Sequence, residues 1–135
     1  MNIELECWNT DGITYELQKI ANVSFEQATI SVSRLDGNNC SQLFIINPQA
    51  NNYMTIAGGN NVFLILLHDD KLETSYHLVN QQPILSNDVT LIIGKQAAEF
   101  SKEVCFTKQQ VEEVLCDYFQ NIDILHSSKH QWKMD

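Results

Sequence analysis

Apolar and polar residues alternate along several short stretches of this chain, which is the pattern of strands that bury one face. The first stretch lies near the amino terminus, where Ile3, Leu5 and Cys7 alternate with two glutamates. Similar stretches cover residues 28–32, 74–78 and 89–93, and the segments 43–46 and 53–56 are also predicted to be strands. The run 62–67 is apolar throughout and predicts a strand that is covered on both faces. Short polar turns separate these stretches, so the sequence predicts an antiparallel meander rather than parallel βαβ units.

A short helix is predicted between the first two of these stretches. Ile13, Leu17 and Ile20 are spaced i, i+4, i+7, and Thr10 or Asp11 is available as the N-cap. Apolar residues between Ile13 and Leu17 also alternate with polar ones, which leaves a strand open for the same segment. The wider spacing favours the helix.

A second, longer helix is predicted to begin after residue 106. Thr107 can accept a hydrogen bond from the third helical amide while the Gln110 side chain reaches back, which makes a capping box. Phe106 and Val111 can pack together as a hydrophobic staple. The apolar stripe then consists of Val111, Val114, Leu115, Tyr118 and Phe119, and the acids Glu112, Glu113 and Asp117 are expected on the exposed face.

These elements predict one α+β domain over residues 1–135. Its 135 residues suit a single core. The expected architecture is an antiparallel β-sheet meander with an N-terminal short helix and a C-terminal amphipathic helix. Because a helix this short is marginal in water, the second helix is expected to pack on the sheet.

The net charge narrows the range of partners. Eight basic and seventeen acidic side chains give a formal charge of −9. Such a surface repels phosphate backbones and anionic membranes, so binding to nucleic acid or to a membrane is not expected. The same charge either keeps the protein soluble or speeds its encounter with a basic partner protein.

The cysteines and the amino terminus bear on the compartment. The four cysteines, Cys7, Cys40, Cys105 and Cys116, are widely scattered with no paired spacing. The first residues lack the basic start and apolar core of a secretion signal, and the longest apolar run is too short to cross a bilayer. We therefore expect a reduced, cytoplasmic protein with free, mostly buried thiols.

No complete motif for metal binding or catalysis is present. His126 and His130 have the spacing of the second half of a zinc finger, but Cys105 and Cys116 do not supply the first half. No nucleophile lies in a strand-turn-helix elbow, and the glycines at 58–59 and 94 do not lead into a phosphate-binding helix. We expect no metal, no cofactor and no enzymatic activity.

Two acidic clusters and one aromatic residue are candidates for partner binding. Asp69, Asp70 and Glu73 are expected on a turn, and Glu112 and Asp117 on the exposed face of the second helix. Such acids are either a solvated surface or a patch that recognises Lys and Arg on a partner. Trp132, near the end of the chain, is a candidate aromatic anchor among several other aromatic residues.

The order of these features resembles the immunity proteins of bacterial polymorphic-toxin and contact-dependent growth-inhibition systems. More narrowly, it is similar to the α+β immunity family that neutralises secreted nuclease or deaminase toxin domains. The matching positions are Leu17 and Ile20, residues 53–58, 91–96 and 111–119, and Trp132. The chain departs from the family pattern at residues 120–123, which lack the glycine that usually ends the family's helix.

The resemblance implies a stoichiometric inhibitor. It would bind one cognate toxin domain in a 1:1 complex in the cytoplasm, and it would carry no catalytic residues. The alternative is an acidic cytoplasmic chaperone for a secreted effector, which would be a homodimer wrapped by an extended client segment. The sequence does not decide whether this chain forms a homo-oligomer.

Overall fold

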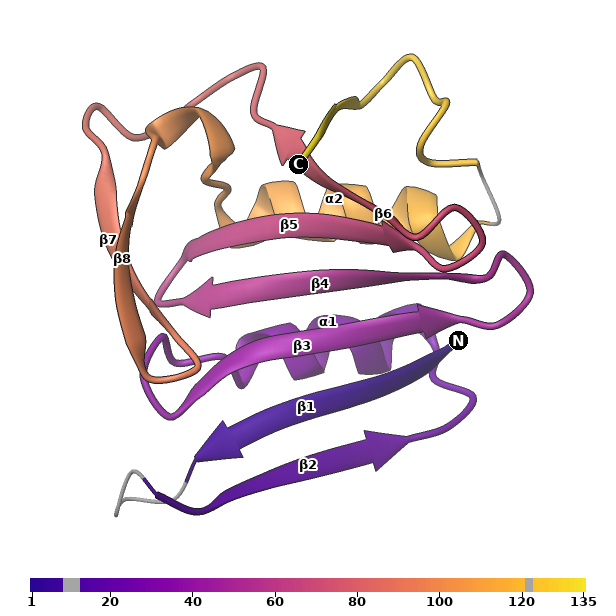
Figure 1. Cartoon of the computed structure of the whole chain (residues 1–135), viewed down its shortest axis with the longest axis horizontal. Helices are drawn as coiled ribbons and strands as arrows, with labels where there is room; N and C mark the ends of the chain where they lie inside the picture. The colour runs from indigo at the N-terminus through magenta and orange to yellow at the C-terminus, as the bar shows by residue number, and fades with distance from the viewer. Residues whose placement is uncertain (9–12, 121–122) are drawn as a thin grey trace.

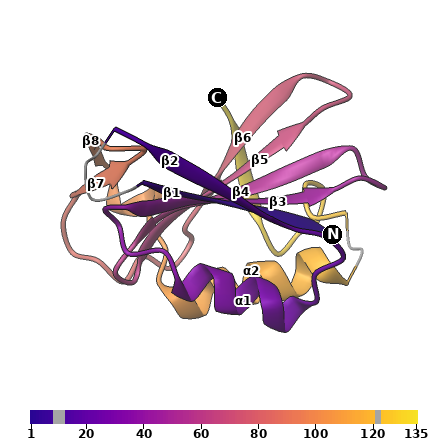
Figure 2. The same cartoon turned by 90° about the horizontal axis from the view of Figure 1, so that it is seen from below.

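A seven-stranded antiparallel sheet forms the body of the molecule, and two helices cover one of its faces (Figures 1 and 2). This computed structural model describes residues 1–8, 13–120 and 123–135. In spatial order the sheet contains β2 (Tyr15–Ile20), β1 (Asn2–Trp8), β3 (Cys40–Asn47), β4 (Asn52–Gly59), β5 (Val62–Asp69), β6 (Thr74–Val79) and β9 (Gln131–Met134). A separate hairpin consists of β7 (Val89–Ile93) and β8 (Gln96–Phe100). The helices are α1 (Phe25–Ser33) and α2 (Lys108–Phe119), and a 3-10 turn, η1 (Lys102–Val104), precedes α2.

The path of the chain explains the strand order. β1 and β2 form a hairpin, α1 then crosses one face of the sheet, and β3 returns on the other side of β1. From β3 to β6 each strand pairs with the next, so the predicted meander is confirmed for this part of the sheet. The predicted α+β class, with a short first helix and a C-terminal helix on an antiparallel sheet, is also confirmed.

The predicted helix at residues 13–20 is wrong, because this segment contains strand β2. All six residues of β2 pair with β1, from Trp8 opposite Tyr15 to Ile3 opposite Ile20. β2 is an edge strand with no helix over it. The apolar residues spaced i, i+4, i+7 are therefore not buried as the stripe of a helix would be, and the alternation of polar and apolar residues is the pattern that matches the structure. The predicted caps Thr10 and Asp11 lie outside the described residues.

The predicted strand at residues 28–32 is also wrong, because this segment belongs to helix α1. Ser24 is the N-cap: its Oγ accepts from the Gln27 amide at 3.2 Å, and its own amide donates to Gln27 Oε1 at 2.8 Å. Ala28, Ser31 and Val32 form the buried face of the helix, whereas Ile30 is 63% exposed. The capping box therefore outweighs the short alternation that suggested a strand.

Helix α2 begins as predicted. Thr107 is its N-cap and forms the capping box with Gln110, and the whole predicted stripe from Val111 to Tyr118 is buried, with Phe119 packed beside it. The backbone of Phe106 pairs with Phe63 in β5, which ties the start of the helix to the sheet. The Asn61 side chain accepts from the Lys108 amide at 2.8 Å. The turn after β4 therefore helps to fix where α2 begins.

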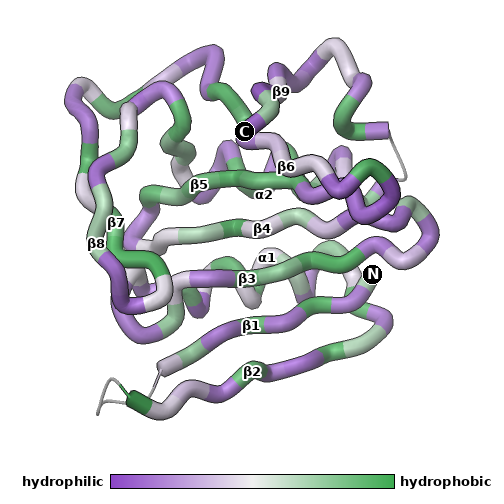
Figure 3. Tube along the Cα trace, viewed as in Figure 1, coloured by the Kyte–Doolittle hydropathy of each residue, from purple (hydrophilic) through white to green (hydrophobic). Residues whose placement is uncertain are grey.

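Two hydrophobic clusters lie on opposite faces of the sheet. The larger one fills the space between the helices and the sheet, and it includes Ile65 from β5 and Leu115 from α2. The smaller one lies beneath the β7–β8 hairpin and includes Leu64 and Leu91. β5 contributes to both clusters and is hydrophobic along most of its length (Figure 3). The prediction that residues 62–67 form a strand covered on both faces is confirmed.

The expectation of four free thiols is wrong for two of them. Cys7 in β1 and Cys40 in β3 are direct cross-strand partners and form a disulfide. Cys105 is free and buried, and Cys116 is free and half-buried, as expected for these two. Within the described residues, no helix is long and apolar enough to cross a membrane.

Candidate partner-binding site at the hairpin end of the sheet

The β3–β4 turn and the β5–β6 hairpin lie at the same end of the sheet, which we call the hairpin end. Asn47, Asn52 and Asp69 are cross-strand neighbours at this end, in β3, β4 and β5. They line one cavity together with Tyr118 of α2, so this row faces the helix side of the sheet. The preceding row, which contains Tyr53 and His68, therefore faces the opposite side.

The cavity at the hairpin end has a volume of about 460 Å³ and carries negative charge. We call it the acidic cavity. Its apolar floor is made by Leu67, Tyr118 and Ile124, and its rim carries the carboxylates of Asp69 and Asp123. None of the described residues that line it is a Lys or an Arg. Its size and charge suit one long cationic side chain.

Local hydrogen bonds hold the two carboxylates in place. Asp69 ends β5, and its Oδ1 accepts from the amides of Lys71 and Leu72 at 2.9 and 3.1 Å, which shapes the turn into β6. Asp123 follows α2, and its Oδ2 lies 2.7 Å from Nδ1 of His126. Each carboxylate is therefore oriented before any ligand arrives, which lowers the entropy that binding must overcome.

Tyr118 forms part of the floor of the acidic cavity. Its hydroxyl donates to Asn52 Oδ1 at 2.6 Å and reaches the carbonyl oxygen of Ile45 at 3.5 Å. Burial raises the pKa of the Tyr118 hydroxyl well above its ordinary value, and the negative charge of Asp70 adds to this effect. The hydroxyl therefore stays protonated and acts as a hydrogen-bond donor in the folded protein.

We expect Tyr118→Phe to flatten the alkaline loss of stability. The unfolded hydroxyl has a pKa of about 10, and the folded one has a higher value. The stabilisation is therefore complete below pH 10 and is lost as the pH rises above it, because only the unfolded state then releases the proton. At neutral pH the variant should lose about 1 kcal/mol with its hydrogen bond.

Urea unfolding at pH 8 and at pH 11 measures this effect. The exposed Tyr15→Phe is the matched control and should keep the pH dependence of the original protein. An equal loss of stability between the two pH values in the Tyr118→Phe variant and the original protein would contradict the assignment.

Of the three predicted turn acids, the structure places Asp69 in the lining of this cavity. Asp70 is the next residue, with its side chain 54% exposed and Oδ1 3.6 Å from Nε2 of His68. Glu73 is exposed in the same hairpin and adopts a positive φ of 50°. The acid that sequence reasoning missed is Asp123, because the tail after α2 contained no motif that predicted its return to the sheet.

The predicted acids of α2 are separated from each other. Glu112 lies partly exposed, with its carboxylate 4.0 Å from Nζ of Lys108 one turn earlier. The prediction that Asp117 lies on the exposed face is wrong, because its side chain is only 13% exposed. Its Oδ2 lies 2.7 Å from Nε2 of His130, and its Oδ1 lies 3.5 Å from Nζ of Lys129. Asp117 therefore binds the segment that precedes β9.

Trp132 also fixes the segment after α2, residues 123–135, which we call the tail. It lies in β9 opposite Leu78 of β6, packs against the larger core, and donates from its indole Nε1 to the carbonyl oxygen of Ile124 at 2.9 Å. The structure thus uses Trp132 and Asp117 to fix the tail to the sheet and to α2. A direct contact of either side chain with a partner stays a prediction.

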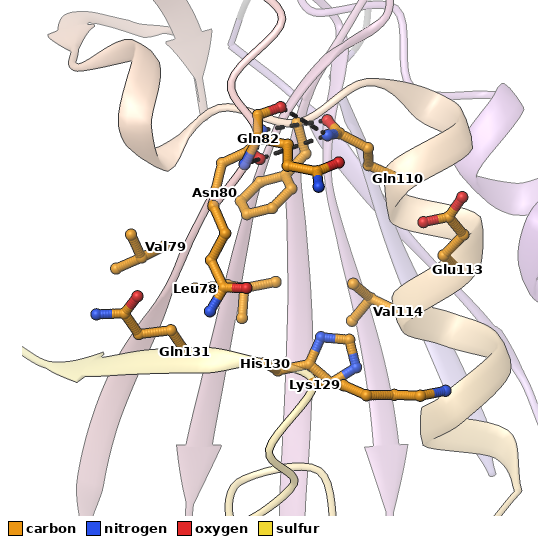
Figure 4. Close-up of a pocket in the computed structure, with 12 residues that line it drawn as sticks. Leu78, Val79, Asn80, Gln82, Gln110, Glu113, Val114, Lys129, His130 and Gln131 are labelled. Carbon is orange, nitrogen blue, oxygen red and sulfur yellow. Dashed lines mark hydrogen bonds between the residues drawn. The ribbon is translucent and has the colours of Figure 1, made fainter.

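A second cleft, of about 240 Å³, lies between the end of β6, α2 and the start of β9 (Figure 4). Asn80 and Gln110 meet at its head, where Asn80 Nδ2 donates to Gln110 Oε1 at 3.2 Å and to the carbonyl oxygen of Cys105 at 2.7 Å. Gln110 Nε2 donates to the carbonyl oxygen of Gln82 at 3.3 Å. These amides satisfy one another, and the cleft is also lined by Glu113 and by Lys129, whose Nζ lies 3.5 Å from Asp117 Oδ1. We therefore interpret the residues of this cleft as structural contacts that join β6, α2 and the start of β9.

One arrangement on the other face has the residue types of a catalytic triad. Ser75 Oγ lies 2.8 Å from Nδ1 of His68, but the Asp70 carboxylate is 3.6 Å from the other ring nitrogen, beyond hydrogen-bond distance. Ser75 also lies within β6, between the paired strands β5 and β9, whereas acyl transfer needs free donors that bind an oxyanion. In this structure Ser75, His68 and Asp70 therefore do not form the continuous hydrogen-bonded chain of a triad.

Within the described part of the chain, no group of three or more His, Cys, Asp or Glu residues could hold a metal ion. The two histidines with zinc-like spacing contact different acids: His126 contacts Asp123, and His130 contacts Asp117.

The sequence matches no protein-family model, and no protein of curated function matches it either.

Proposed function

We propose that this protein is an immunity protein that binds a cognate secreted toxin domain, a nuclease or a deaminase, and neutralises it in a 1:1 complex. The observation that carries the proposal is the acidic cavity, where Asp69 and Asp123 flank an apolar floor, and where the lining residues that the structure describes include His126 but no Lys or Arg. A toxin domain that grips nucleic acid presents Lys and Arg, and the cavity has the volume and charge to accept one such side chain.

Charge explains how such a complex would form quickly and hold tightly. The formal charge of −9 attracts a basic domain over long range and raises the association rate, most of all at low salt. Once docked, a cation between two oriented carboxylates makes charge-assisted hydrogen bonds, which are about twice as strong as neutral ones. A single buried anchor of this kind can dominate an interface.

The proposed place of action is the cytoplasm, where an immunity protein must act on a toxin that has entered. Thiols in that compartment are kept reduced. The Cys7–Cys40 disulfide of the structure would therefore be reduced there and would form again in protein purified without reductant, while the backbone hydrogen bonds of β1 and β3 keep the two strands paired in both states.

Co-expression with a toxin domain taken from a neighbouring gene, followed by co-purification, tests the proposal. We expect a 1:1 complex and restored growth of cells that express the toxin. The double variant Asp69→Asn, Asp123→Asn removes both cavity charges and keeps the oxygen atoms that shape the turns. It should weaken the complex about 100-fold, as expected for a hot-spot pair worth about 2.7 kcal/mol.

The matched control is Glu16→Gln, Glu99→Gln, which changes the net charge equally at two exposed positions in β2 and β8. It should slow association slightly and leave the dissociation rate unchanged. If the two double variants weaken the complex equally, the cavity is not the anchor. If the toxin domain does not co-purify at all, the proposed function is wrong.

The alternative, an acidic chaperone for a secreted effector, is favoured by one observation. β2 is at the edge of the sheet and exposes Tyr15, Leu17 and Ile20, so an extended client segment could pair with it. A homodimer in light scattering that binds an unfolded effector segment would support this reading. A monomer that binds only a folded toxin domain would contradict it.

A further inference from the structure

The helix-free face of the sheet carries a second feature that the acidic cavity does not explain. Both helices lie on one side of the sheet (Figure 2), and the side chains of alternate residues in β1, β3 and β4 project from the other. Among these residues, Glu4, Phe44, Ile46 and Tyr53 line a pocket of about 260 Å³. Their neighbours Leu5, Ile45 and Met54 are buried in the core on the helix side.

The strand register creates this pocket. Glu4 of β1 lies directly opposite Phe44 of β3, and Ile46 of β3 lies opposite Tyr53 of β4. The rings of Phe44 and Tyr53 meet edge to face, with centroids 6.3 Å apart and planes at 75°. Two aromatic rings at a steep angle, with a carboxylate beside them, form the kind of cage in which proteins hold cations.

The chain itself places a cation beside the carboxylate of this pocket. Lys19 of the edge strand β2 is the cross-strand partner of Glu4, and its Nζ lies 3.8 Å from Glu4 Oε1. The Lys19 side chain is 69% exposed, whereas that of Glu4 is 29% exposed. An ion pair that is so open to water is weak, so another cation can displace the lysine at little cost.

We propose that Glu4, Phe44 and Tyr53 form a binding site for an arginine side chain that a partner protein presents. Arginine fits better than lysine, because its planar guanidinium can lie against an aromatic ring while its N–H groups donate to a carboxylate. The site lies on the opposite face of the sheet from the acidic cavity, near the same end, so a partner that wraps the hairpin end could reach both.

The proposed site predicts opposite effects on arginine affinity for substitutions of Glu4 and Lys19. Glu4→Gln removes the carboxylate and should weaken arginine binding about fivefold or more, whereas Lys19→Gln removes the competing ammonium and should tighten it about twofold to threefold. Phe44→Leu keeps the strand apolar and removes one ring, so it should weaken binding about threefold. A role that was merely structural would not give opposite signs at Glu4 and Lys19.

Titration of the isolated protein with N-acetyl-arginine amide, followed by two-dimensional NMR, tests the site. The neutral analogue N-acetyl-citrulline amide has nearly the same shape and is the matched control probe. We expect saturable shifts of the Phe44 and Tyr53 amides with arginine, with a dissociation constant on the order of 1 mM, and no saturation with citrulline.

Three results would overturn the proposal. These are equal shifts with both probes, no saturable shift at all, or shifts confined to Asp69 and Asp123 that disappear in the Asp69→Asn, Asp123→Asn variant. The titration needs no toxin domain, so its failure and the failure of the immunity proposal are separate results.

Discussion

Replacement of Gly59 by alanine is expected to destabilise the protein by about 4 kcal/mol or more, since it combines backbone strain with a clash against the backbone of Asp36 and Gly37. Gly59 has a φ of 151°, which residues with a side chain rarely adopt. A Cβ atom there would lie 2.1 Å from the amide nitrogen of Gly37 and 2.6 Å from the carbonyl carbon of Asp36. Both of these are backbone atoms that cannot rotate away.

Urea unfolding followed by circular dichroism measures this loss, and a chain that is already unfolded in buffer counts as the full effect. Gly37→Ala is the control, because Gly37 also has a positive φ of 73° but a Cβ there would meet its neighbours at 3.5 Å or more. That variant should lose only about 1–2 kcal/mol from strain alone. If both variants lose the same amount, the close approach of the two backbones does not govern the effect.

Removal of the Cys7–Cys40 disulfide is expected to cost about 2–4 kcal/mol, because the crosslink restricts the unfolded chain. The bond closes a loop with a sequence separation of 33 residues. Cys7→Ser, Cys40→Ser removes it, and Cys116→Ser, which changes a free and half-buried thiol, is the control. The control should change the free energy of unfolding by less than about 1 kcal/mol.

Thiol counting checks the bond itself. Protein that is purified without reductant, unfolded in urea and alkylated should take up label only at Cys105 and Cys116, which are the free thiols. Labelling of all four cysteines under these conditions would contradict the disulfide. Equal unfolding midpoints with and without reductant would contradict its contribution to stability.

Long apolar segments and helix caps could be predicted from the sequence, whereas short segments were misassigned. Thr107 and Gln110 marked the start of α2 because the capping signature precedes a full apolar stripe. Ser24 and Gln27 carry the same signature before α1, but the alternation of Ala28, Ile30 and Val32 with polar residues predicts a strand there instead. A stretch of five residues fits both periodicities, and only the tertiary partner decides between them. For residues 28–32, the Ser24–Gln27 capping box is the sequence feature that indicates a helix.

Strands β8 and β9 could not be predicted, for a different reason. β8 (Gln96–Phe100) is mostly exposed, and β9 (Gln131–Met134) has only four residues, so neither shows a buried alternation. Each strand forms through antiparallel backbone hydrogen bonds with a neighbour: β8 pairs with β7, and β9 pairs with β6. Backbone pairing of this kind leaves little trace in the order of side chains.

The candidate site was predicted only in part. The residues that were not predicted correctly, Asp123 and Asp117, depend on the position of the tail that ends in β9. The turn acid Asp69 was identified because acids cluster around it in sequence. Asp123 joins Asp69 only in three dimensions, after the tail has folded back along α2. The helical position of Asp117 predicts a solvated side chain, but His130 and Lys129 of the same tail cover it. Long-range docking of a polar segment leaves no periodic signal.

The docked tail couples ligand affinity to a local unfolding equilibrium. Asp123 belongs to a segment whose attachments include the Asp117–His130 contact, the Trp132 indole bond and the short pairing of β9 with β6. Such a segment can detach while the rest of the sheet stays folded, and detachment removes half of the cavity's charge. A partner that binds the acidic cavity only while the tail is docked must therefore shift this equilibrium toward the docked state. The amide hydrogens of residues 123–134 should then exchange more slowly in the complex than in the free protein.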